Sequence, residues 1–156
     1  MRARRTILLT SFGGFPGAPV NPSQAVAALA LQFARGRLQR LGIDLVCENL
    51  PVVFALTGPT LSALFAQHRP QAVLHLGLAA SRRAVTPESR ALNRLTLRHA
   101  DARDQRSKGN AVLPGGAAIL PASLSAARRT RVLRASGLPP PCRAARATIS
   151  AIRHCT

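Results

Sequence analysis

The residue types in this chain that could do covalent chemistry are three cysteines, together with four histidines that could activate them. A thiol becomes a strong nucleophile when an imidazole within hydrogen-bonding reach takes its proton. Cys155 follows His154 directly, but adjacent side chains on a helix or strand point in different directions, so they make a poor nucleophile–base pair. We therefore expect neither Cys155 nor Cys142, which follows three prolines, to be catalytic.

The other cysteine and histidines fit structural roles. Cys47 lies in the apolar run LVCENL, where we expect a buried and inert thiol. His75 lies in VLHLGL and is expected to be a core side chain with its polar atoms satisfied, whereas His68 and His99 lie in polar surroundings and are expected to be exposed. Three cysteines without regular spacing argue against both a disulfide framework and a zinc site, so we expect no metal and no cofactor.

The charge of the chain suggests a polyanion partner, but other features weaken that interpretation. Lys and Arg number 22 against 5 Asp and Glu, a formal net charge of +17. Lys108 is the only lysine, and abundant Arg, Ala and Pro are typical of a GC-rich coding sequence. Aromatic residues make up only 3%, which argues against base-stacking surfaces. We therefore expect any nucleic-acid binding to be non-specific and salt-dependent.

Apolar runs are too short for a secretory signal or a membrane span. The run that follows the basic start MRARR is shorter than the ~7–15 residues of a signal core. No stretch reaches the about 20 apolar residues that cross a bilayer. We expect a cytoplasmic protein with no membrane partner.

The elements that must position any site alternate along the first half of the chain. Apolar, β-rich runs predict strands at 5–12, 43–50 and 71–79, and helical periodicity with capping residues predicts helices at 21–42 and 57–70. This order predicts right-handed βαβ units, which form a parallel sheet with helices on both faces. Ligand sites in such sheets lie beyond the carboxyl ends of the strands.

The second half is less regular. Residues 98–121 are polar and rich in Gly and Pro, which indicates a long surface excursion or an edge hairpin, and residues 122–137 predict a last helix. By the carboxyl-end rule, the loops that follow Phe12 and Ala79 are the places to look for a site.

Those two loops carry a resemblance. FGGFPGAPVNPS and GLAASRRAVTPESRALN match, at the same separations, a pattern of pyroglutamyl peptidase I, a family of cysteine peptidases. The similarity extends from about residue 5 to residue 139. It implies a three-layer α/β/α domain over 1–139 with a mostly parallel central sheet, incomplete at the C-terminus. It also implies removal of N-terminal pyroglutamyl residues from peptides.

The resemblance assigns roles to five residues. Family members use a Cys nucleophile, a His base and a Glu that orients the His, and Glu88 falls on the Glu position. Phe12 and Phe15 fall where aromatic rings enclose the pyrrolidone ring, and Leu78 and Arg82 complete the expected substrate-binding set. Without the family pattern, we would interpret Glu88 and Arg82 as charged side chains exposed to solvent. We would likewise interpret Phe12 and Phe15 as core residues.

The family's nucleophile and base motifs are missing from the tail. The Cys-Asn motif expected beyond GLP does not occur in residues 140–156, and no histidine follows Cys155 that could be the later His of the family. Many codons could encode this segment. If they are read in the frame that starts at the third base of each codon, they permit the sequence Tyr-Leu-Cys-Asn near Ala151, which contains the missing Cys-Asn motif. We therefore expect a frameshift or truncation near Pro139, an irregular tail outside the family over 140–156, and an inactive chain.

Two alternatives stay open at this stage. One is a basic binding protein for nucleic acid or another polyanion that reuses the peptidase fold without catalysis. The other is an active enzyme that uses Cys142 as its nucleophile. The family's habit also suggests a homo-oligomer.

Overall fold

Strand β1 (Arg5–Phe12) lies between two parallel partners, β2 (Ile43–Leu50) and β3 (Ala72–Leu76). The computed structural model describes residues 4–79, 82, 84–95, 100–107, 109–137 and 149–150. A short strand, β6 (Ile149–Ser150), pairs antiparallel with β3 and completes the order β2-β1-β3-β6. The three predicted parallel strands are confirmed, although β3 ends at Leu76, three residues before the predicted end.

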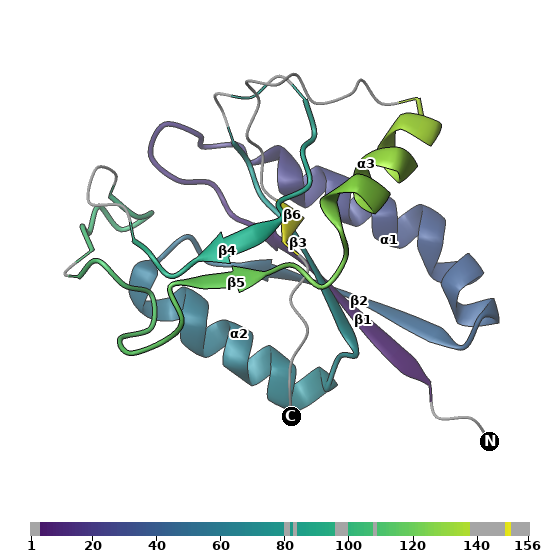
Figure 1. Cartoon of the computed structure of the whole chain (residues 1–156), viewed down its shortest axis with the longest axis horizontal. Coiled ribbons are helices and arrows are strands. Elements are labelled where there is room, and N and C mark those ends of the chain that lie inside the picture. Colours follow the sequence, from purple (N-terminus) through teal and green to yellow (C-terminus); the bar gives the residue numbers. More distant parts are fainter. Residues whose placement is uncertain are drawn as a thin grey trace.

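Helices cover both faces of this sheet, which confirms the predicted three-layer α/β arrangement (Figure 1). On one face, Leu64 of α2 (Phe54–His68) packs in a core cluster with Leu8, Leu50 and Val73. On the other face, α1 (Pro22–Arg40) covers β1 and β2. Helix α3 (Ala126–Ala135) lies on the same side as α1. The alternation of side chains along β1 therefore buries both of its faces.

The start of α1 is tied to the end of β1. The Asn21 side chain accepts a hydrogen bond from the Ser23 N–H and donates one to the carbonyl of Gly13, both at 3.1 Å. The Ser23 hydroxyl accepts from the Phe12 N–H at 3.1 Å. Asn21 acts as the N-cap and Pro22 as the first helical residue, as the sequence predicts. This contact fixes the loop that follows Phe12 at both of its ends.

Helix α2 begins three residues earlier than predicted, at Phe54 rather than Thr57. Its N-cap residue, Val53, has no capping side chain, and the Phe54 N–H instead donates to the Asp101 carboxylate at 3.0 Å. Asp101 is 47 residues away in sequence, so no local pattern could show this cap. The prediction of the helix start was wrong for that reason.

Asp101 also organises the excursion that contains it. Its carboxylate accepts from the backbone N–H groups of Arg103 at 2.9 Å and Gln105 at 3.0 Å. Burial raises the pKa of Asp101, but the hydrogen bonds from Gln105, Arg103 and Phe54 and the charge of Arg103 outweigh burial and hold it below its ordinary value. The ionised Asp101 thus connects the excursion to the start of α2.

The end of the segment predicted as an excursion or hairpin forms a small sheet with a strand that lies before that segment. Strands β4 (Arg90–Leu92) and β5 (Ile119–Pro121) pair antiparallel and do not join the main sheet. Between them, the Asn93 side chain accepts from the Leu113 N–H and donates to the Leu113 carbonyl, both at 2.8 Å. The last helix, α3, starts at Ala126 rather than residue 122, because Ser125 caps it by accepting from the Arg128 N–H.

The sequence predicted the environment of His75 correctly but not that of His68. His75 Nδ1 lies 2.6 Å from the hydroxyl of the fully buried Thr10, so the prediction of a satisfied core histidine is confirmed. His68 was expected to be exposed, but its side chain is only 19% exposed and lies 3.8 Å from Glu48. That prediction was wrong, because the end of α2 packs His68 beside β2.

Buried His75 should make the stability of the fold fall in mild acid. Burial lowers the pKa of His75 below its ordinary value of 6.5, so below that pH the unfolded chain binds a proton that the folded chain does not. Stability should fall as pH drops through about 6.5, by at most about 1.4 kcal/mol per pH unit. Urea denaturation between about pH 7.5 and pH 5.5 measures this. The slope should be smaller in His75→Gln, and equal slopes in both proteins would contradict the assignment.

Candidate active site

The two phenylalanines of the candidate site lie at the carboxyl edge, the edge of the sheet where β1, β2 and β3 end. Phe12 ends β1 and is half-buried against the core cluster on the α2 face. Phe15 lies in the following loop, also half-buried, and its backbone forms two hydrogen bonds with Ala18, at 3.0 and 2.8 Å. The loop turns tightly here, since a Cβ on Gly14 would lie 2.2 Å from the Pro19 carbonyl oxygen. The loop therefore requires glycine at position 14.

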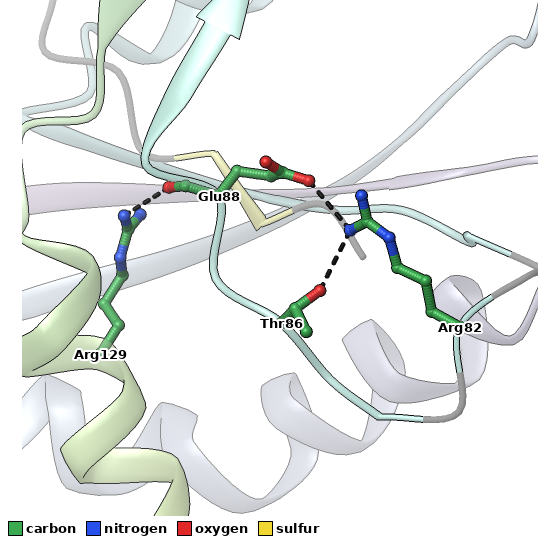
Figure 2. Close-up of polar contacts among 4 residues, drawn as sticks. All are labelled: Arg82, Thr86, Glu88 and Arg129. Atoms are coloured by element: carbon green, nitrogen blue, oxygen red, sulfur yellow. Dashed lines mark hydrogen bonds and ion pairs between the residues drawn. The ribbon is translucent and has the colours of Figure 1, made fainter. Parts of the chain in front are cut away.

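The loop after β3 carries the other three residues. Leu78 is half-buried and follows the end of β3 by two residues. Arg82 and Glu88 meet in an ion pair, with Arg82 Nη1 3.0 Å from Glu88 Oε1. The same nitrogen donates to the hydroxyl of the buried Thr86 at 3.0 Å. Figure 2 shows the three side chains converging within the loop that connects β3 to β4.

This ion pair is shielded from solvent. The Arg82 side chain is 11% exposed and that of Glu88 is 25% exposed. At such exposure, solvent screens the two charges less than it screens a surface pair. The interpretation of Glu88 and Arg82 as separate solvated charges is therefore wrong, and Arg82 instead holds the carboxylate of Glu88 in place.

A further residue, which the sequence interpretation missed, holds Glu88 from the opposite side. The guanidinium of Arg129, on α3, donates to the backbone carbonyl of Glu88 (Figure 2). Burial lowers the pKa of Arg129, and the nearby charge of Glu88 partly opposes that shift. Arg129 is one of 22 Lys and Arg residues, so its residue type alone does not single it out. Its helical spacing from Leu133, four residues on, was the signal that it lies on the inward side of α3.

The described part of the chain does not assemble a nucleophile–base pair. Its free cysteine is Cys47, half-buried in β2, and burial, aided by the charge of Glu48, raises the pKa of its thiol. The pKa shift agrees with the expectation of an inert thiol. Cys142, Cys155, His99 and His154 lie outside the described residues. Within those residues there is also no group of three or more side chains that could hold a metal ion.

Solved structures that share this fold are pyrrolidone carboxyl peptidases. That from Thermus thermophilus superposes with a TM-score of 0.73 at 33% identity, covering 85% of this chain and 66% of that one. Pyroglutamyl Peptidase I from Bacillus amyloliquefaciens gives a TM-score of 0.76 at 28% identity, covering 93% and 66%. The shared α/β fold places this chain among proteins of that architecture.

The chain belongs to the pyroglutamyl peptidase family, whose model matches residues 5–150. The pyrrolidone-carboxylate peptidase of Gloeobacter violaceus is 37% identical over 133 residues, which are 85% of this chain and 62% of that protein. That of Cupriavidus necator is 34% identical, over 86% of this chain and 60% of that protein. The chain thus spans about three-fifths of the length of these relatives. In the part of the chain that the structure describes, no helix is both long and apolar enough to cross a bilayer.

Removing Arg82 should weaken the fold, because the shielded Glu88 carboxylate then loses the ion pair with this guanidinium. We expect Arg82→Met to lower the free energy of unfolding by about 1–3 kcal/mol. In a double-mutant cycle with Glu88→Gln, the two losses should be less than additive. The matched control is Arg90→Met, which removes an exposed arginine on β4 and should change stability by less than about 0.5 kcal/mol. Equal losses in the two arginine variants would contradict a specific ion pair.

Proposed function

We propose that this protein binds the N-terminal pyroglutamyl group of peptides at the carboxyl edge of its sheet. Phe12, Phe15, Leu78 and Arg82 would be the substrate-binding residues, and Glu88 the residue that orients the catalytic base. Membership of the pyroglutamyl peptidase family supports the choice of substrate. A flat, neutral lactam suits an apolar slot bounded by aromatic rings, with backbone groups supplying a few hydrogen bonds.

The observation that carries the proposal is the fixation of Glu88. Arg82 binds its carboxylate, and Arg129 binds its backbone carbonyl from α3. A carboxylate that orients a histidine must keep a constant position and remain charged, because it selects the tautomer of the imidazole and stabilises its protonated form. This carboxylate is the group that would accept the N–H of that histidine.

Hydrolysis itself needs two further groups. In the reaction that the family name implies, a cysteine thiolate attacks the pyroglutamyl carbonyl carbon and forms a thioester as the amine leaves with a proton from the base. Water, activated by the same base, then releases pyroglutamate and restores the thiol. The described residues supply neither group, so we propose that this chain binds the pyroglutamyl group without cleaving it. We also propose a cytoplasmic location and a homo-oligomer.

Two measurements test this proposal together. The chain and its Cys142→Ala variant are assayed with a fluorogenic pyroglutamyl amide, and both should show only the background rate. Binding of pyroglutamyl-alanine amide is then measured by calorimetry against prolyl-alanine amide, which lacks the ring carbonyl. Cleavage abolished by Cys142→Ala would show instead that Cys142 is a nucleophile.

A matched pair of phenylalanine variants tests where pyroglutamyl-alanine amide binds. We expect Phe15→Ala to weaken binding of pyroglutamyl-alanine amide by about tenfold, through loss of one aromatic wall. Phe33→Ala removes the same side chain from α1, where Phe33 is 76% exposed, and should leave affinity unchanged. No preference for the pyroglutamyl over the prolyl compound, or equal effects of the two substitutions, would overturn the proposed site.

A further inference from the structure

A hollow lies on the α3 side of the molecule, and we call it the α3 hollow. It has a volume of about 410 Å³, within the range of small-molecule sites. Five apolar side chains line it, together with two adjacent arginines of α3: Leu74, Pro87, Leu124, Val132, Leu133, Arg128 and Arg129.

The α3 hollow lies on the opposite face of the sheet from Phe12, although it adjoins Glu88, because Arg129 both lines the hollow and donates to the Glu88 carbonyl. Its floor is Leu74 of β3, whose partner across the parallel pair is Leu9 of β1. Phe12 instead packs with Leu8, which points to the opposite face of the sheet from Leu9. The α3 hollow therefore opens on the α1–α3 face, while the Phe12 ring lies on the α2 face.

The charged side chains that line the α3 hollow are both cationic. Neither α3 nor the lining set contains an acidic residue. Glu88 follows Pro87, but its carboxylate is bound by Arg82. Among the residues that the structure describes, none accepts a hydrogen bond from the guanidinium of Arg128. An apolar hollow with cationic groups on one wall complements a ligand that has an apolar body and a single anionic end.

We infer that the α3 hollow binds a carboxylate with an unbranched apolar chain, of the fatty-acid type. The carboxylate pairs with Arg128, while the chain lies against Leu74, Leu124 and Leu133. A guanidinium matches a carboxylate in a two-point hydrogen bond, which favours this anion over a spherical one. The inference uses residues on the opposite face from Phe12 and does not depend on the proposed pyroglutamyl binding.

The first experiment compares three probes of equal chain length on the full chain. Decanoate, decanol and decyltrimethylammonium are titrated below their micelle-forming concentrations and followed by calorimetry and by NMR of leucine methyl groups. We expect one molecule of decanoate per chain, with the largest shifts at Leu74 and Leu133. Octanoate should bind more weakly, by up to about fourfold for each methylene lost. Decanol bound as tightly as decanoate, or several decanoates per chain, would overturn the inference.

A matched pair of arginine variants separates a specific site from the attraction of a strongly basic protein for any anion. Arg128→Gln and Arg131→Gln each remove one exposed arginine from α3, but only Arg128 lines the hollow. We expect Arg128→Gln to weaken decanoate binding by about tenfold, whereas Arg131→Gln changes it by less than about twofold. Both side chains are exposed, so both variants should fold, which melting curves check. Equal losses in the two variants would mean adhesion to charge alone and would overturn the site.

Discussion

The burial of β1 on both of its faces is the constraint on which the rest of this structure depends. Leu8 and Leu9 are 0% and 2% exposed, although they point to opposite faces of the sheet. That burial requires a helix on each face and a parallel strand on each side, because the backbone groups of a buried strand must all find partners. It fixes the position of Phe12, and therefore the start of the loop that carries Phe15.

The loops at the carboxyl edge also depend on contacts with residues that lie outside the βαβ units. Glu88 follows β3 by a long loop, and its position comes from Arg82 within that loop and from Arg129 on α3. Asp101 similarly connects the excursion to the start of α2. Each of these contacts places a charge where water is scarce, so each is specific in geometry. The carboxyl edge is thus held by charged hydrogen bonds, whereas the sheet beneath it is held by apolar packing.

This division explains what the sequence could and could not predict. Strands β1 and β2 were predicted at their observed bounds, because apolar runs and glycine stops are local signals. The start of α2, the shielded position of His68 and the role of Arg129 depend on residues distant in sequence, so no local pattern shows them. The family motif singled out Glu88 as a candidate site residue, and this motif lies in the loop between β3 and β4. The pairing of Glu88 with Arg82 needed the three-dimensional structure, since both residues also fit an exposed loop.

The central claim is that the carboxyl-edge loops form a site for the pyroglutamyl group, although the residues that the structure describes assemble no nucleophile–base pair. The most direct measurement is the map of backbone amide shifts, from ¹H–¹⁵N NMR, on adding pyroglutamyl-alanine amide to the full chain. We predict that the shifts concentrate between Phe12 and Phe15 and between Leu78 and Glu88. Shifts confined to other parts of the chain, or no shifts at saturating ligand, would contradict the account.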